Sequence, residues 1–420
     1  MEPICIIGAG PAGLMAAIWA ARNQAKVLVL EANSTAGRKL LLTGGGRCNF
    51  THAAGPEEIA KAFGKPGRFL RHGLYEFPPD EVREFFRWRE LPSTVESDGC
   101  VFPISDQAAD VRNILVAEAA KLGVRIRYQS RVQSVVATDG GFTVRAENGQ
   151  ILASRVILAT GGLSWPQTGS TGDGYRFAAE LGHAVVPPKP ALVPLVAREP
   201  WVSDLAGVSL ANVRLRATVD ARELTAVGNM LFTQRGIGGP AAQDLSRHLT
   251  DVVFQNAHSI AIEIDVLPGL NEGQLDKRLQ HGLQAQAKKN VANVLSECLS
   301  LPKQLLQTLC LLAGCGRGAL AGQLPSEKRR QLTQWIKKLP LCITDTEPIA
   351  RATVTRGGVS RDEIDPKTME SKIRPGLFFA GEVIDLDGPC GGYNLQMCWS
   401  TGALAGRSAA KTPGQMKEST

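Results

Sequence analysis

Three glycines near the start of the chain have the type and spacing that suit phosphate binding. The segment GAGPAG at residues 8–13 fits the pattern G-x-G-x-x-G. A continuous apolar run, residues 4–7, precedes it, and an Ala-rich segment follows it, as in a buried strand and a helix. A second apolar run ends at Glu31. The pattern predicts a strand–helix–strand unit that binds a dinucleotide.

Each glycine of this pattern has a separate physical task. Gly8 permits the tight turn, Gly10 lets a pyrophosphate approach the backbone, and Gly13 allows close packing of helix on strand. The helix N-terminus offers unpaired N–H groups and a partial positive charge to the phosphates. Glu31 would accept hydrogen bonds from the adenosine ribose hydroxyls, and its charge disfavours a 2′-phosphate. The alternative is an ordinary strand-to-helix turn without a ligand.

A second glycine-rich segment, residues 37–49, narrows the choice of dinucleotide. Its three consecutive glycines, residues 44–46, let backbone approach a planar ring or a phosphate without a side-chain clash. Arg38 and Arg47 are suited to pair with phosphate or a substrate anion. A dehydrogenase for soluble nicotinamide usually continues with further strand–helix units instead. The alternative for this segment is a solvated surface loop.

Composition and charge bound the class of protein. The 420 residues are 44% hydrophobic, which excludes a chain that is mainly disordered. The net charge is +7, from 47 Lys and Arg against 40 Asp and Glu. It suggests an anionic partner, although a mildly basic soluble enzyme is the alternative. We find no apolar run near the ~18 residues of a membrane helix and no basic leader, so we expect a cytoplasmic protein.

The cysteines and histidines show no metal or disulfide pattern. The nine cysteines form an odd set without a CxxC pair, which argues against a disulfide framework, a zinc site and a redox motif. Reduced thiols in a cytosol are the simplest interpretation. The six histidines have no metal-ligand spacing, so we predict no metal.

The pattern of elements changes three times along the chain. Residues 187–200 carry five prolines and look like an exit from the first domain. Short strands separated by turns follow, as in a small β domain. Residues 271–340 are rich in Gln, Leu, Ala, Lys and Arg, as in a helical insertion, and the last part returns to strand, glycine-rich loop and helix.

The run GRKLLLTGGGRCNFTH, residues 37–52, resembles the signature of the BaiN/RdsA-type (YhiN-like) bacterial FAD-binding flavoproteins. The resemblance continues in register through residues 98–111, 156–175, 231–247 and 351–402. It implies an α/β fold with a Rossmann-like FAD-binding domain that is discontinuous in sequence, residues 1–190 and 357–412. A small barrel-like β domain, residues 191–270 and 341–356, and a helical insertion, residues 271–340, would separate the two parts.

The resemblance also implies which positions bind FAD. They are Gly8, Gly10, Pro11, Ala12, Gly13, Glu31, Arg38, Lys39, Gly44, Gly45, Gly46, Arg47, Cys48, Val132, Thr160, Gly161, Gly381, Glu382, Gly391, Gly392, Asn394 and Leu395.

The last glycine-rich block also has an independent physical interpretation. A strand, residues 377–380, meets Gly381, and a helix is predicted to begin near Asn394. A helix N-terminus aimed at the pyrimidine edge of a flavin would stabilise the anionic reduced ring. Glu382 and Asp387 have an alternative role as turn and cap residues.

The chain departs from the family pattern at two places. The usual T-H-x-G-x-S-G-P appears at residues 233–240 with Gln234 and Gly238 in place of His and Ser. That puts any acid–base role there in doubt. The loop before Gly391 often carries an aromatic residue, where this chain has Pro389 and Cys390.

Candidate catalytic residues are few. Cys390 is a candidate proton donor near the flavin, with a small buried thiol as the alternative. Cys48, Asn49 and Tyr393 are the other expected neighbours of the ring. We find no base–nucleophile pair in the sequence, and flavin chemistry needs little from side chains beyond orientation of the cofactor.

Basic residues in the helical insertion predict a partner. Lys328, Arg329, Arg330, Lys337 and Lys338 surround an apolar set at helical spacing. They form either a solvated face or a contact surface for rRNA phosphates. The residues that would extend such a surface are Arg68, Arg71, His72, Arg83, Arg87 and Arg89.

Three functions compete, and the resemblance implies the first two. The favoured one is an FAD-dependent reductase of an activated C=C bond, with NADPH or NADH as a transient donor because we find no second G-x-G-x-x-G. Uridine in 23S rRNA, giving dihydrouridine, is the favoured substrate, and unsaturated bile-acid ketones are the alternative. The second function is an aminoacetone or amine oxidase. The third is a non-catalytic RNA-binding protein with structural FAD.

Overall fold

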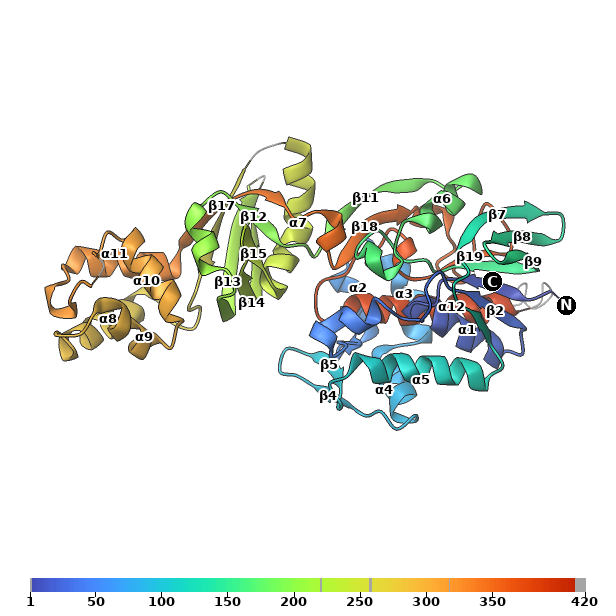
Figure 1. The fold of residues 1–420 in the computed structure, drawn as a ribbon, viewed down its shortest axis with the longest axis horizontal. Helices are drawn as coiled ribbons and strands as arrows, with labels where there is room; N and C mark the ends of the chain where they lie inside the picture. The colour runs from blue at the N-terminus through green and yellow to red at the C-terminus, as the bar shows by residue number, and fades with distance from the viewer. Residues whose placement is uncertain (1, 220, 257–258, 317, 412–420) are drawn as a thin grey trace. The chain divides into compact units, whose positions relative to one another are not determined.

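The computed structural model describes residues 2–219, 221–256, 259–316 and 318–411, and the chain divides into two compact units (Figure 1). One unit runs to Pro190 and resumes at Thr353, and the other is Ala191–Ala352. Each unit has its own cluster of buried apolar side chains. The first unit is therefore discontinuous in sequence.

A five-stranded parallel sheet forms the centre of the first unit. Its order is β19 (Leu377–Phe379), β10 (Arg155–Leu158), β1 (Ile4–Ile7), β2 (Val27–Leu30) and β6 (Arg125–Arg127). Every residue of β1 and β2 is buried, which explains their continuous apolar runs. The predicted Rossmann-like α/β class is confirmed.

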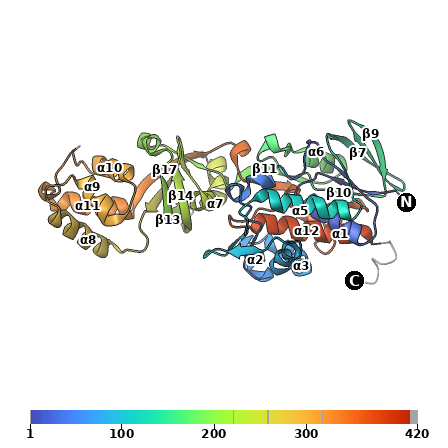
Figure 2. The same ribbon diagram turned by 60° about the horizontal axis from the view of Figure 1, so that its bottom comes forward.

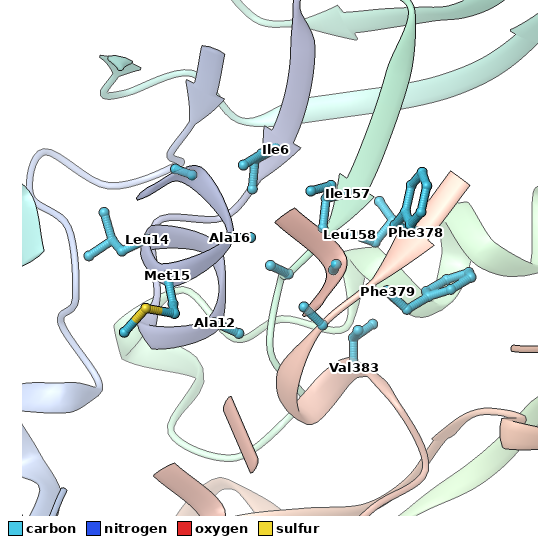
Figure 3. Close-up of a cluster of buried hydrophobic side chains, with 14 of the residues drawn as sticks. Ile6, Ala12, Leu14, Met15, Ala16, Ile157, Leu158, Phe378, Phe379 and Val383 are labelled. Atoms are coloured by element: carbon cyan, nitrogen blue, oxygen red, sulfur yellow. The ribbon is translucent and has the colours of Figure 1, made fainter. Parts of the chain in front are cut away.

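Two helices lie against this sheet in unusually close contact. They are α1 (Pro11–Arg22) and α12 (Tyr393–Ala410). A Cβ atom on Gly402 would lie 2.5 Å from the carbonyl oxygen of Ala12, and one on Gly406 would lie 2.2 Å from that of Ala16. Both contacts advance in the same direction along the two helices, so α1 and α12 run parallel. Figure 3 shows Ala12 and Ala16 of α1 within the buried cluster that also holds Phe378 of β19.

Smaller elements complete the first unit. Three smaller sheets accompany the parallel one: the antiparallel sheets β3–β5–β4 and β7–β8–β9, and the pair β11–β18. Their strands are β3 (Thr51–His52), β4 (Ser93–Val95), β5 (Cys100–Pro103), β7 (Val132–Thr138), β8 (Gly141–Ala146), β9 (Gly149–Ala153), β11 (Val185–Ala191) and β18 (Val354–Val359). The remaining helices are α2 (Pro56–Ala62), α3 (Gly67–Glu76), α4 (Pro79–Arg87), α5 (Ala108–Lys121) and α6 (Asp173–Glu180).

The second unit holds a closed antiparallel barrel and a helical bundle. The barrel order is β12 (Leu195–Ala197), β15 (Gly236–Gly238), β14 (Arg222–Phe232), β13 (Ser209–Val219), β16 (Ile260–Asp265) and β17 (Leu339–Thr346). This confirms the expected barrel-like insertion. The helix α7 (Pro240–Asn256) packs against the barrel strand β14. Figures 1 and 2 show one bundle of helices in this unit. Its members are α8 (Glu272–Ala285), α9 (Val291–Leu299), α10 (Lys303–Leu312) and α11 (Ser326–Lys337).

A search of the described ranges finds no helix that combines the length and the apolar character needed to cross a bilayer.

The contact between α1 and α12 leads to a stability prediction. Gly406→Ala would place a methyl group against backbone that cannot yield, so we expect the free energy of unfolding to fall by about 1–3 kcal/mol. Urea denaturation measures the change. Gly140→Ala is the matched control, because its Cβ would meet no atom within 4 Å. Equal stability of the two variants would contradict the close contact.

Candidate functional site

The predicted cofactor residues gather at one edge of the parallel sheet. Parallel strands all end at the same edge, which is where ligands bind in open α/β sheets. Residues predicted to bind the cofactor follow four of the five strands within three positions. They are Gly8 after β1, Glu31 after β2, Thr160 and Gly161 after β10, and Gly381 after β19.

The first turn has the shape that a pyrophosphate needs. Gly8 has a φ of +103°, and a Cβ there would lie 2.5 Å from the carbonyl oxygen of Ala159. A Cβ on Gly13 would lie 2.0 Å from the carbonyl oxygen of Gly8. At Gly10, by contrast, a Cβ would meet no atom within 4 Å. Gly8 and Gly13 are therefore fixed by packing, whereas Gly10 keeps space open at the N-terminus of α1.

Glu31 is held in one orientation beside this turn. Its Oε2 accepts a hydrogen bond of 2.8 Å from the N–H of Ala9, and its Oε1 accepts one of 2.8 Å from the N–H of Asn33. The side-chain amide of Asn33 also donates to Oε1, at 2.7 Å. Arg38 in turn donates to the Asn33 Oδ1 at 2.7 Å. Oε2 thus has one protein donor and retains capacity for a ribose hydroxyl.

Val132 lies close to the same edge through the backbone. The N–H of Ser130 donates to the carbonyl oxygen of Glu31 at 2.9 Å. This bond brings the start of β7, where Val132 is buried, beside the end of β2.

A second helix N-terminus points the same way as the first. Ala12 is the second residue of α1, whereas Gly402, which it contacts, is the tenth residue of α12. At 1.5 Å per residue, the start of α12 extends about 12 Å beyond the start of α1. Both ends offer unpaired N–H groups and a partial positive charge. An extended dinucleotide fits two such ends at this offset.

The glycine loop presents bare backbone. Gly44, Gly45 and Gly46 have φ values of +57°, +68° and +92°, which favour glycine at three successive positions. A Cβ at Gly45 or Gly46 would meet no atom within 4 Å. This loop fits the approach of a planar ring or a phosphate.

The two residues after this loop are engaged with protein groups. The Arg47 guanidinium donates to the Glu96 carboxylate at 2.8 Å and lies 3.8 Å from the centre of the Phe102 ring. The Cys48 side chain is fully buried, and burial raises the pKa of its thiol to about 12. Any contact of Cys48 with a cofactor is therefore through its backbone.

Lys39 and Glu382 form an ion pair with each other. The Lys39 Nζ lies 2.7 Å from the Glu382 Oε2, and the Glu382 Oε1 accepts a hydrogen bond of 2.8 Å from the N–H of Thr355. The Ser164 hydroxyl also donates to Oε1, at 2.9 Å. Burial raises the pKa of Glu382, but the Lys39 charge and these bonds outweigh it, so the pKa is lowered. The pair joins the glycine-rich segment at residues 37–49, to which Lys39 belongs, to the turn at Gly381.

Asn394 and Leu395 belong to the first turn of α12. The Asn394 side chain accepts a hydrogen bond of 2.8 Å from the N–H of Gly388 and donates to the carbonyl oxygens of Gly388 and Pro389. It therefore fixes the loop that carries Cys390. Leu395 is buried.

The structure brings the three predicted catalytic residues together and adds His52. The His52 ring stacks on the Tyr393 ring, with 4.6 Å between centres. The His52 Nδ1 lies 3.0 Å from the carbonyl oxygen of Gly391. A carbonyl can only accept, so Nδ1 carries the proton of this hydrogen bond. Nε2 lies beside Gly99, where a Cβ would be 2.5 Å from it. A Cβ on Gly392 would lie 2.8 Å from the Asn49 Oδ1, which places Asn49 beside the same turn.

Two more residues of this cluster were missed in the sequence. Asp98 accepts a hydrogen bond of 3.0 Å from the N–H of Cys100. Burial, then the hydrogen bond and charge of Asp98 and, as the smallest contribution, the nearby Cys390 together raise the pKa of the Cys100 thiol to about 12. Cys100 is therefore a neutral thiol near pH 7. His52 and Cys100 are register partners in β3 and β5, and strands this short leave no periodic signal.

The predicted basic face of the insertion was wrong at two residues. Lys337 is buried, and its Nζ pairs with Asp265 at 2.7 Å and donates to two backbone carbonyls. Arg329 makes two parallel hydrogen bonds to Asp276, at 2.9 and 3.0 Å. Lys338 is exposed but pairs with Glu272 at 3.1 Å. Packing against the barrel and α8 therefore removes Lys337 and Arg329 from a common face. Lys328 is half-buried, and Arg330 is exposed.

The arginines expected to extend that face are mostly paired within the first unit. Arg71 pairs with Glu57, Arg83 with Asp80, Arg87 with Glu84 and Arg89 with Glu118. Arg68 and His72 are exposed. Within the ranges that the structure describes, no group of three His, Cys, Asp or Glu residues is placed to hold a metal ion.

Known sequences match this chain over nearly its whole length. The model of the family described as HI0933-like protein Rossmann domain matches residues 2–408. A 3-dehydro-bile acid delta(4,6)-reductase from Clostridium scindens is 35% identical over 416 residues, covering 98% of this chain and 100% of that protein. A ribosomal RNA dihydrouridine synthase from Escherichia coli is 32% identical over 413 residues, covering 94% of this chain and 95% of that protein.

Solved structures share the fold at low identity. A 3-ketosteroid delta1-dehydrogenase from Sterolibacterium denitrificans superposes with a TM-score of 0.54 at 12% identity, covering 97% of this chain and 99% of that one. A quinol fumarate reductase chain from Escherichia coli gives 0.53 at 17% identity, covering 99% of this chain and 72% of that one.

The contrast between Gly10 and Gly13 leads to a binding prediction. Gly10→Val fills open space, so we expect FAD affinity to fall by more than about tenfold with little change in the stability of the flavin-free protein. Gly13→Ala is the comparison, because it forces the turn apart and lowers stability as well. Flavin absorbance after dialysis and urea denaturation measure the two quantities. Full FAD retention by Gly10→Val would contradict the assignment.

Proposed function

The chain belongs to the HI0933-like Rossmann-domain family, and we propose that it reduces an activated C=C bond with uridine in 23S rRNA as its substrate. The family makes it an FAD-dependent oxidoreductase. The proposal concerns the bond that is reduced, the substrate that carries it and the residues that act on it. The donor would be NADPH or NADH, bound transiently.

Two relatives support reduction of a C=C bond. One is named a delta(4,6)-reductase of a 3-dehydro-bile acid, and the other a synthase of dihydrouridine in ribosomal RNA. Both names describe saturation of a C=C bond in an unsaturated ring. Such a reaction needs a hydride at one carbon and a proton at the other. The two names leave a small unsaturated ketone as the alternative substrate.

The observation that carries the proposal is the placement of His52 at the N-terminus of α12. Reduced FAD, when bound, supplies the hydride. The residues that would hold FAD are the glycine turn at residues 8–13, Glu31 and the glycine loop at residues 44–46. The Gly391 carbonyl and the Tyr393 ring orient His52, whose Nε2 would deliver the proton. The N–H groups at the start of α12 would stabilise negative charge that develops before the proton arrives.

Two other functions remain as alternatives with distinct outcomes. An aminoacetone or amine oxidase would produce peroxide with an amine present and would need no nicotinamide. A non-catalytic RNA-binding protein would hold a flavin that neither NADPH nor NADH reduces. We expect the reaction to occur in the cytoplasm, because nine free cysteines suit a reducing compartment.

The substrate is tested by deleting the gene and measuring dihydrouridine in purified 23S rRNA by nucleoside mass spectrometry. We expect the modified base to disappear and to return with the wild-type gene. The Gly10→Val variant should fail to restore it, because that variant loses FAD. Unchanged dihydrouridine in the deletion strain would overturn the rRNA substrate and leave small unsaturated ketones to be screened.

The proton-donor role of His52 is tested by the His52→Gln variant. Loss of a positioned acid slows reduction of the substrate by ~10²–10⁴-fold, whereas bleaching of the flavin by NADPH under anaerobic conditions should not change. Stopped-flow spectroscopy separates the two steps. His72→Gln is the matched control, since His72 is an exposed histidine on α3. If saturating substrate reoxidises the reduced flavin of both variants at the wild-type rate, His52 is not the proton donor.

A further inference from the structure

The excess positive charge of the protein is confined to one segment. Residues 271–340 contain eleven Lys and Arg against four Asp and Glu. The other 350 residues contain 36 Lys and Arg and 36 Asp and Glu. The helical insertion therefore carries the net charge of +7 by itself, and the remainder of the chain is formally neutral.

The acidic residues of this insertion are mostly neutralised by its own cations. Glu272 pairs with Lys338, Asp276 with Arg329, and Glu297 with Lys289. These pairs leave an unbalanced set of cations on the surface of the bundle. The question is where the remaining cations lie.

Three of them lie on α8 or just beyond its end, and Lys303 is exposed on α10. Lys277, Arg278 and His281 are exposed, and Lys288 is exposed just beyond the end of the helix. No acidic residue occurs between residues 277 and 296. The opposite face of α8 packs into the bundle through Leu275, Leu279, Gly282 and Leu283, which are buried.

A neighbouring helix adds one more cation to this surface. Arg330 of α11 is exposed, and its neighbour in the chain, Arg329, donates to the carboxylate of Asp276 on α8 at 2.9 and 3.0 Å. Arg330 therefore lies near the first turns of α8. We call the set Lys277, Arg278, His281, Lys288 and Arg330 the α8 patch.

We propose that the α8 patch is a docking surface for the phosphates of an RNA substrate. This inference rests on the proposed function, and it specifies where the substrate is held. Lys and Arg on exposed stems neutralise phosphates and release counterions, which supplies affinity without reading sequence. The reacting uridine would be selected elsewhere, at the site that holds the cofactor.

The composition of the patch favours RNA over a protein partner. Protein interfaces depend on buried aromatic or apolar anchors and contain few lysines. The exposed residues of α8 include no large apolar side chain. The exposed large apolar residues of the insertion in the described ranges, Leu311 and Leu320, belong to other segments.

The test is a triple variant, Lys277→Gln, Arg278→Gln and Lys288→Gln, in the full-length FAD-bound protein. Gln keeps the helix propensity of Lys and Arg. The matched control, Lys26→Gln, Lys121→Gln and Arg145→Gln, removes the same charge from exposed positions outside the insertion. Binding to a uridine-containing 23S rRNA fragment is measured by fluorescence anisotropy over a series of salt concentrations.

We expect the α8 variant to lose at least about tenfold in affinity and about 2–3 units of slope in log K against log salt, because each phosphate contact contributes about 0.7–0.9. The control should bind as wild type does. Flavin bleaching by NADPH should be the same in all three proteins. Equal weakening in both variants would overturn the proposal, since net charge alone would then explain binding.

Two further outcomes separate this surface from the proposed function. If the α8 variant binds RNA as tightly as wild type, the surface is wrong even where the protein makes dihydrouridine. If RNA binding depends on the patch but deletion of the gene leaves dihydrouridine unchanged, the surface stands and the substrate assignment fails.

Loss of binding to poly-glutamate with unchanged RNA binding would identify an acidic protein as the partner and would also overturn the proposal.

Discussion

The close parallel contact between α1 and α12 is the constraint on which the site depends. Glycines at 402 and 406 let the two backbones approach until a single methyl group would clash. This contact fixes the direction of both helices and the offset between their N-termini. Buried polar side chains then tie α12 to its surroundings, as when Trp399 donates to the carbonyl oxygen of Phe50 at 2.7 Å. The partial positive charge of a helix N-terminus stabilises a ligand only if the helix is held in a fixed position. Here the backbone contact fixes the N-termini of both α1 and α12.

The parts of the site that depend on local geometry could be predicted from the sequence. The turn at residues 8–13 and the acid at Glu31 belong to one strand–helix–strand unit, so spacing alone predicted them, and the structure pairs the two strands of that unit in parallel. The ion pair between Lys39 and Glu382 joins residues 343 positions apart. His52 meets Gly391 across 339 positions. Contacts of this kind follow from the assembled fold, and no local pattern reports them.

Helical periodicity misled at α11 for a related reason. It separates polar from apolar positions, but it does not say where a long side chain ends. The Lys337 stem is buried while its ammonium group reaches Asp265 and two backbone carbonyls. The basic residues of α8 flank an apolar face of the same kind. Lys277 and Arg278 nevertheless form no ion pair with the residues that the structure describes, unlike Arg329 and Lys337 of α11. The pattern of charge pairs thus identifies a surface better than the pattern of charges.

The thiols near the glycine loop have a consequence for durability. A flavin that has been reduced can pass its electrons to oxygen and release peroxide where it forms. Peroxide attacks the thiolate form of cysteine, and the fraction of thiolate falls as the pKa rises. Burial raises the pKa values of Cys48 and Cys398 to about 12, and burial with Asp98 does the same at Cys100. The same burial that packs the loops therefore makes these sulfur atoms poor targets for oxidation by peroxide that forms nearby.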